Sequence, residues 1–337
     1  MTAYILRRLL LMIPTLFGIS LVCFVLIQFV PGGPVEEVIF KMRARLGSDR
    51  GSSTQRISEE EVKNTKAYYD YDKPAAVRYW KWIGKLLQGD LGNSFAYHKP
   101  VLGVIVSKFP VSIIFGLTSF FLSYLISIPL GVHKAMGHGG FFDASTSVLI
   151  FAGYVIPGYA LGILLIIFFA GGSYFDWFPI GNLVSDQFET LSFPGKVWDL
   201  VRHMTLPLIC YMVSEFAMLT LLMKNSMLDE LSKDYIRTAL AKGLSRRQAV
   251  WRQAFRNSLI PIATGIGSIF TVMFASALLI ERVFDLDGMG LLFYNSVLSR
   301  DYNVVLGVIV LGSFAAMLGR LFSDLIYVVI DPRIRLD

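Results

Sequence analysis

Charged side chains are scarce in this 337-residue sequence: they make up 17% of it, against 54% hydrophobic and 14% aromatic residues. So small a share of charge excludes an ordinary soluble globular protein and puts the membrane class first. Cysteine is almost missing, and Cys23 and Cys210 both lie in apolar runs. A disulfide framework or a cysteine metal site is therefore not expected, and both residues are interpreted as small hydrophobic side chains.

Sequence motifs for catalysis and nucleotide binding are also missing. No G-x-x-x-x-G-K-[ST], H-E-x-x-H or G-x-S-x-G pattern occurs, and the four histidines are scattered. We therefore expect that the chain is not an enzyme and binds no cofactor or metal. The net charge of +6 does not point to nucleic acid, because no basic patch is interleaved with exposed aromatic residues.

Long apolar runs are the main feature that is present. A bilayer core of about 30 Å is crossed by roughly 20 residues of helix. Runs of about that length occur at 9–30, 111–132, 145–170, 204–223, 259–279 and 304–330. The sequence therefore predicts an all-α membrane protein with six transmembrane helices, and Pro14, Pro129 and Pro157 predict kinks in the first, second and third of them.

The distribution of Lys and Arg over the short connections predicts the orientation of these spans. Basic residues dominate the N-terminus, with Arg7 and Arg8, and the fourth connection at 224–258, whereas Asp and Glu dominate the third and fifth connections. Both termini are therefore predicted to be cytoplasmic. The first connection, 32–109, is also basic, but loops longer than about 60 residues are translocated largely regardless of charge.

Three parts follow from this topology: the first span (1–31), a long periplasmic or external loop subdomain (32–109), and a five-span membrane core (110–337) that includes the cytoplasmic segment 224–258. The loop begins with a polar, Ser-rich stretch at 45–66 and continues with AAVRYWKWIGKLLQGDLGNSF. The second stretch fits an amphipathic helix on the outer membrane surface, with Trp80 and Trp82 at the interface. A small external subdomain that binds a partner fits equally well.

The stretch YIRTALAKGLSRRQAVWRQAFRNSLIPI, residues 235–262, contains no acidic residue and carries Arg237, Lys242, Arg246, Arg247, Arg252 and Arg256. Its apolar spacing predicts a short helix that ends at Gly243, with one face formed by Tyr235, Ile236, Ala239 and Leu240. Ser245 and Gln248 predict a capping box that starts a second helix, with one face formed by Val250, Ala254 and Phe255. The two helices are predicted to meet at a glycine elbow. Such a pair suits either a partner's cleft or an anionic lipid surface.

A resemblance to a known family decides between these two alternatives. RTALAKG followed by RNSLIP resembles the coupling motif of ABC importer permeases, E-A-A, three residues, Gly, with Arg237, Thr238, Ala239 and Gly243 at the E, A, A and G positions. The Arg-Thr-Ala opening and the distant Pro261 are characteristic of the dipeptide, oligopeptide and nickel branch.

Further stretches resemble the B-type permease subunit of that branch. They are RRLLLMIPTLFGISLVCFVLIQFVPGGP (7–34), GDLGNSF (89–95), SRDYNVVLG (299–307) and DPRIR (331–335). Asp287-Gly288 stands where the family usually has Pro-Gly, and together with the long loop this is most similar to the Yej subgroup, associated with uptake of peptides and of microcin C type antibiotics.

The resemblance implies the type I, MetI-like permease fold in a bacterial inner membrane. It also implies the partners: a homologous second permease forming a heterodimer, two ATPase domains, separate or fused, that bind ATP and Mg, and an external peptide-binding protein that delivers peptide. The residues implied to contact the ATPase are Tyr235, Arg237, Thr238, Ala239, Ala241, Lys242, Gly243 and Arg247.

Ionisable residues inside the spans are candidate site residues, because each costs a few kcal/mol at mid-membrane. Glu215 is the most central. It either lines the pathway and contacts the amino end of a peptide or accepts hydrogen bonds from a neighbouring helix. Gln28 and Glu281 are candidates for an outer gate, and Arg320 with Asp324 is predicted to form an ion pair. A self-sufficient secondary transporter or channel is the alternative function, although the sequence lacks the internal symmetry expected of one.

Overall fold

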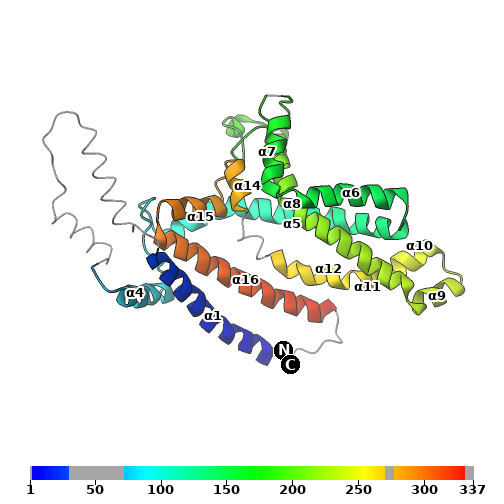
Figure 1. Ribbon diagram of the computed structural model, residues 1–337, viewed down its shortest axis with the longest axis horizontal. Coiled ribbons are helices and arrows are strands. Elements are labelled where there is room, and N and C mark those ends of the chain that lie inside the picture. Colours follow the sequence, from blue (N-terminus) through cyan, green and yellow to red (C-terminus); the bar gives the residue numbers. More distant parts are fainter. Residues whose placement is uncertain (1, 30–71, 173, 270–276, 331–337) are drawn as a thin grey trace. The chain divides into compact units, whose positions relative to one another are not determined.

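The computed structural model describes residues 2–29, 72–172, 174–269 and 277–330. These residues form helices and turns (Figure 1), and the only β pairing among them is an isolated bridge between Asn93 and Pro100. The prediction of an all-α protein is therefore confirmed for the described part of the chain. Several predicted features lie wholly or partly outside it: the end of the stretch 7–34, the first part of the loop 32–109 with its Ser-rich stretch at 45–66, residues 270–276 of the fifth apolar run, and DPRIR at 331–335.

Within the described residues, four helices are long and apolar enough to cross a membrane. They are α1 (Thr2–Phe29), α5 (Val101–Met136), α8 (Phe193–Ser232) and α16 (Tyr302–Ile330). They coincide with the first, second, fourth and sixth predicted runs. With 40 residues, α8 is about 60 Å long, twice the thickness of a hydrocarbon core, so it extends well beyond its apolar run.

The third predicted run forms two helices, α6 (Phe141–Val155) and α7 (Gly158–Phe169), with a bend of 102° between them. The bend confirms the kink predicted at Pro157, whereas α1 and α5 each remain one helix through Pro14 and Pro129. Ile156 is extended, with φ −78° and ψ 121°, because a residue before proline is disfavoured in the helical region. Counted as one span, this pair brings the described total to five.

The other helices are short. They are α4 (Ala75–Leu87), η1 (Phe188–Thr190), α9 (Asp234–Ala241), α10 (Arg246–Ala249), the π-helical turn η2 (Val250–Ala254), α11 (Phe255–Ser258), α12 (Ile260–Thr264), η3 (Gly265–Ser268), α14 (Leu278–Val283) and α15 (Met289–Leu298). Of these, α12 and η3 cover the described start of the fifth predicted run.

The chain divides into two compact units. One contains residues 1–8, 110–291 and 315–337, and the other contains 9–109 and 292–314. The first unit has two buried clusters. One is centred on Phe115, Cys210 and Phe284, and the other on Val132, Met223 and Val250. The second unit has a cluster in which Tyr79 and Trp82 of α4 pack with Phe24, Leu306 and Val310.

Candidate functional site

The basic segment, residues 224–258, continues from the end of α8 in the first unit, where Figure 1 shows α9 and α10 beyond α8 and α11 and α12 leading away from them. Lys233 is extended and separates α8 from α9. Ile236 and Ala239 of α9 are buried, whereas Leu240 is 41% exposed. The predicted inner face was therefore right for Ile236 and wrong for Leu240.

Gly243 ends α9 with a Schellman motif. Its φ of +91° is in the left-handed region, which favours glycine. The Gly243 N–H donates to the Leu240 carbonyl (2.9 Å), and the Leu244 N–H donates to the Ala239 carbonyl (3.2 Å). These two bonds satisfy carbonyls that the end of a helix leaves without partners. The predicted helix stop is confirmed, and its conformation favours glycine.

The predicted capping box starts the second helix two residues later. The Gln248 N–H donates to Ser245 Oγ (3.3 Å), and the Ser245 N–H donates to Gln248 Oε1 (3.0 Å). The elbow, residues 242–245, is therefore closed by hydrogen bonds on both sides, so α9 and α10 keep a defined mutual geometry.

Residues beyond the elbow hold the basic segment on the ends of the long helices. Val250 and Ala254 are fully buried, as predicted for their face. They share one cluster with Ile236 of α9, Val132 of α5 and Met223 of α8. A displacement of α9 would therefore be passed directly to α5 and α8.

Tyr235 fixes the start of α9. Its hydroxyl donates to Glu230 Oε2 (2.5 Å) at the end of α8 and accepts from Asn257 Nδ2 (3.2 Å) of α11. Burial, followed by the hydrogen bond to Glu230, raises the pKa of Tyr235 above its ordinary value. The hydroxyl is therefore protonated and acts as a donor across the physiological pH range.

The remaining predicted coupling residues lie on the surface. Exposed side chains from both sides of the elbow include Arg237, Thr238, Ala241, Lys242 and Arg247, and Gly243 itself is also exposed. The ion pair between Arg237 and Asp234 is long (3.4 Å) and solvent-exposed, so it contributes little stability. Leu240, which is also exposed, adds an apolar side chain to this mainly basic group of residues. Ala239 does not belong to it, because it is buried in this chain.

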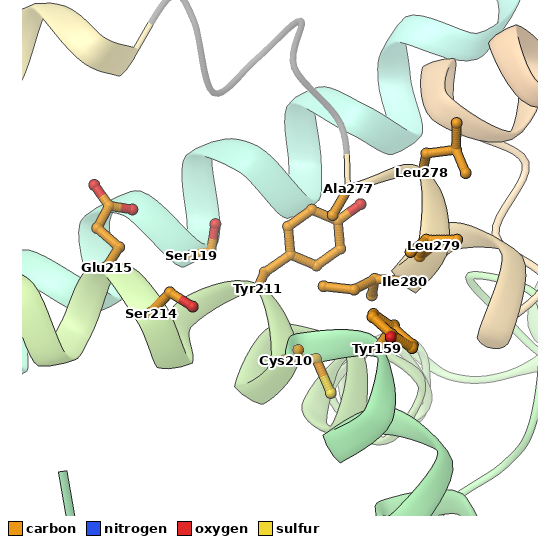
Figure 2. A pocket seen from close by; sticks show the side chains of 11 residues that line it. Ser119, Tyr159, Cys210, Tyr211, Ser214, Glu215, Ala277, Leu278, Leu279 and Ile280 are labelled. Atoms are coloured by element: carbon orange, nitrogen blue, oxygen red, sulfur yellow. The ribbon is translucent and has the colours of Figure 1, made fainter. Parts of the chain in front are cut away.

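A separate cavity of about 450 Å³ lies in the same unit, within the size range of small-molecule sites. Its lining comes from α5, α7, α8 and the start of α14 (Figure 2), and its polar members are Ser119, Tyr159, Tyr211, Ser214 and Glu215. Glu215 is partly buried, and its carboxylate has no hydrogen bond or ion pair within the described ranges. The structure thus places the candidate Glu215 in a cavity and supplies it with no described structural partner.

Glu281, a predicted gate residue, is fully buried. Its carboxylate accepts hydrogen bonds from the Leu291 N–H (2.8 Å), the Ser112 hydroxyl (3.3 Å) and the Tyr211 hydroxyl (3.3 Å). Ser112 Oγ in turn accepts from the Met289 N–H (2.8 Å). The side chain joins α5, α8 and the turn from α14 to α15, so its position is internal rather than on an open surface.

Two other predicted charged or polar residues also have partners. In the second unit, Gln28 Oε1 accepts a hydrogen bond from Arg78 Nη2 (2.6 Å). In the first unit, Asp324 pairs with Arg8 Nη2 (2.9 Å) and accepts from the Tyr4 hydroxyl (2.8 Å). The predicted pairing of Asp324 with Arg320 is therefore wrong: residues from the other end of the chain bind this carboxylate.

Sequence reasoning missed a buried charge cluster that joins α5, α6 and α8. Lys134 has no exposed side-chain surface, and its Nζ lies 3.1 Å from Asp143 Oδ1 and donates to the hydroxyls of Thr146 (2.7 Å) and Ser147 (2.9 Å). Lys224 Nζ contacts the same carboxylate at 2.8 Å. None of these residues was among the predicted site residues. The signal that could have revealed the cluster is the aspartate Asp143, which follows Lys134 by nine residues at the end of a predicted span.

Comparison with known proteins agrees with this architecture. Residues 127–336 match the family model described as the binding-protein-dependent transport system inner membrane component. The chain is 43% identical to the peptidoglycan transport system permease protein YejB of Agrobacterium fabrum, over 99% of this chain and 98% of that protein. It is 39% identical to the inner membrane ABC transporter permease protein YejB of Escherichia coli O157:H7, over 99% of both chains.

More distant relatives include the dipeptide transport system permease protein DppB of Escherichia coli K12, which is 33% identical over 99% of both chains. The resemblance to B-type peptide permeases, nearest the Yej subgroup, is confirmed. Permeases of this kind are not themselves catalytic, and the long apolar helices are those of a multi-pass inner membrane protein. The chain belongs to the family of inner membrane components of binding-protein-dependent transport systems.

Proposed function

We propose that this chain is the transmembrane permease subunit of an ATP-binding-cassette importer that moves peptides or peptide-like compounds across the cytoplasmic membrane. The observation that carries the proposal is the hydrogen-bonded elbow, which presents an exposed basic and apolar surface on a chain similar to peptide permeases over its whole length. Six spans with both termini in the cytoplasm complete the topology, the fifth span including residues 259–279.

The names of the relatives support peptides as the substrate class. They include peptidoglycan, oligopeptide and dipeptide transport permeases, and peptide antibiotics of the microcin C type belong to the same chemical class. All of these compounds present amide bonds and charged ends. A cavity that combines a carboxylate with tyrosine and serine hydroxyls matches that chemistry.

Glu215 is the residue proposed to contact the substrate. Glu215 is one of the residues that line the cavity, as are Ser214 and Tyr211 of α8 (Figure 2). A peptide's terminal ammonium is a donor that such a carboxylate would bind strongly in a low-dielectric site. Gln28 and Glu281 would act on the pathway only indirectly, by positioning the helices that they join.

The partners follow from the proposed function. A homologous permease completes the pathway, two ATPase domains, separate or fused, hold ATP and Mg, and an external binding protein delivers the peptide. No cofactor is proposed for this chain. The ATPase surface is formed by the exposed residues at the elbow, with Leu240 as an apolar anchor and basic side chains around it, an arrangement common in protein interfaces.

Movement would be transmitted through the cluster that holds the basic segment. Because Ile236, Val250 and Ala254 share a core with residues of α5 and α8, closure of the ATPase domains would move these long helices together with α9. A packed core has discrete arrangements rather than continuous ones, so a small displacement at α9 would switch the pathway between inward and outward access.

Ala241→Asp tests the coupling surface. Ala241 is exposed, so the added carboxylate costs the isolated chain little, but it would be buried without a partner in an ATPase groove. We expect ATP-dependent uptake of a labelled peptide to fall by more than about tenfold, or about 1.4 kcal/mol, while the amount of membrane-inserted chain is unchanged.

The matched control is Ala75→Asp. Ala75 is an exposed alanine at the first position of α4, where a carboxylate is compatible with the helix dipole, and uptake should be kept. Unchanged uptake in Ala241→Asp, together with ATPase subunits that still co-purify with the chain, would contradict the assignment of this surface.

A further inference from the structure

Helix α4 has three distinct strips along its 13 residues. At 100° per residue, Tyr79, Trp82, Ile83 and Leu86 share one strip, and this strip packs with Phe24, Leu306 and Val310. The remaining surface divides into an apolar flank and a basic flank. The apolar flank contains Val77 (49% exposed), Trp80 (61%) and Leu87 (84%). The basic flank contains Arg78, Lys81 and Lys85.

Contacts with the long apolar helices α1 and α16 indicate how deep α4 lies in the membrane. On α1, Gln28 and Phe24 lie about 3 and 9 Å from the end of the predicted span at residue 30. On α16, Leu306 and Val310 lie about 3 and 9 Å from the end of its span at residue 304. Contacts to these four residues, together with those of Tyr79 to Ser20 and Phe17, put α4 beside roughly the outer 20 Å of the α1 span and the outermost 10 Å or so of the α16 span.

The two flanks point in opposite directions along α1. On the basic side, Arg78 Nη2 donates to Gln28 near the end of α1 (2.6 Å). On the apolar side, the ring of Trp80 lies 5.9 Å from that of Phe17, which is about 16 Å further from that end of the helix than Gln28. Within this unit, the basic flank thus faces the water-side end of the span and the apolar flank faces its middle.

We propose that α4 lies in the membrane interface of the leaflet where α1 ends and α16 begins, with Val77, Trp80 and Leu87 among the acyl chains and Lys81 and Lys85 at the phosphates of the headgroups. Interfacial helices bury an apolar face in the bilayer and carry Lys and Arg on the polar face, which matches the two flanks of α4. The sequence left this helix open between a lipid surface and a partner-binding subdomain.

Lipid fits the apolar flank better than a water-soluble protein does. Trp80 lies against Phe17 of α1, and the buried strip of α4 packs against residues of α1 and α16 that belong to the predicted spans, so lipid already occupies that depth. Tryptophan is enriched at this level of membrane proteins because its ring is amphipathic. The inference requires that α1 and α16 cross the membrane, and it stands even if the proposed coupling to an ATPase fails.

Spin labels on the two flanks test the proposal. In the full-length protein, purified with the subunits that accompany it, Cys23 and Cys210 are replaced by alanine, and single cysteines are introduced as Val77→Cys, Leu87→Cys, Lys81→Cys and Lys85→Cys. The labelled protein is reconstituted into vesicles of phosphatidylethanolamine and phosphatidylglycerol. For each spin label, the frequency of collision with oxygen, which dissolves in acyl chains, is compared with the frequency of collision with a water-soluble nickel chelate.

We expect labels at positions 77 and 87 to collide with oxygen and to be shielded from nickel, at a depth of about 5–10 Å below the phosphates, and labels at 81 and 85 to show the reverse. Nickel access at 77 and 87 equal to that at 81 and 85 would overturn the proposal. Protection of 77 and 87 from both reagents would also overturn it, because a protein would then cover that flank.

A second measurement avoids introduced cysteines, in case they impair folding. In vesicles that contain brominated acyl chains, part of the tryptophan fluorescence of the otherwise unaltered chain should be quenched, and Trp80→Phe should remove that part. Equal quenching with and without Trp80 would contradict the inference.

Discussion

Glu281 shows what a carboxylate requires inside an apolar bundle. It is fully buried, and donors from α5, α8 and the first turn of α15 surround it. Gly288 closes the remaining side: a Cβ atom there would lie 2.6 Å from the carboxyl carbon of Glu281 and 2.7 Å from Oε2. The Asp287-Gly288 pair, which departs from the family's usual Pro-Gly, keeps the glycine that this close approach needs.

Gly288→Ala should therefore destabilise the protein by about 1–3 kcal/mol, the usual cost of overpacking a buried site. Thermal unfolding of the purified protein in detergent, followed by loss of helical circular dichroism, measures the effect. The control is Gly312→Ala, where an added Cβ meets nothing within 4 Å. A Gly288→Ala variant that melts at the same temperature as the Gly312→Ala variant would show that the contact with Glu281 is unimportant.

At the scale of elements, the elbow between α9 and α10 is the part of the chain whose geometry depends most on individual residues. A Schellman motif ends one helix, a capping box starts the next, and both share a core with α5 and α8. Such an element would transmit a displacement of α9 to α10, because the two helices cannot rotate independently about the connection. Its stiffness depends on the left-handed conformation of Gly243.

Gly243→Ala should impair ATP-dependent uptake, because an L-residue with a Cβ costs about 1–2 kcal/mol in the left-handed region. No neighbouring atom lies within 4 Å of the added Cβ, so the effect comes from the backbone and not from a clash. Gly243→Asn should keep more activity, since asparagine tolerates this conformation. Equal uptake by the Gly243→Ala variant and by the unaltered chain would contradict the proposed role of the elbow.

The elbow was predictable from sequence and several charged contacts were not, for a physical reason. Gly243 and the pair Ser245 and Gln248 act on backbone groups within a few residues, so a local pattern is sufficient. The exposure of Leu240 and the partners of Glu281 depend on which distant helices pack nearby, and no local pattern encodes that. The same limit explains why Asp324 pairs with Arg8 rather than with Arg320, its predicted partner.

At the scale of the whole molecule, the chain is a membrane component without a described nucleotide site of its own. It is similar over 99% of its length to inner membrane permeases. In the account proposed here, peptide passes along a pathway to which Glu215 contributes, and the energy enters through the elbow from ATPase domains on other polypeptides. The central claim is therefore that this chain performs transport only when it is coupled to those domains.

Uptake of a labelled peptide into proteoliposomes tests that claim most directly. The chain is reconstituted alone under a proton or sodium gradient, and in parallel with its second permease, its ATPase domains, its binding protein and ATP. The account predicts no uptake in the first preparation and uptake that requires ATP hydrolysis in the second. Gradient-driven uptake by the chain alone would contradict it and would identify a self-sufficient secondary transporter.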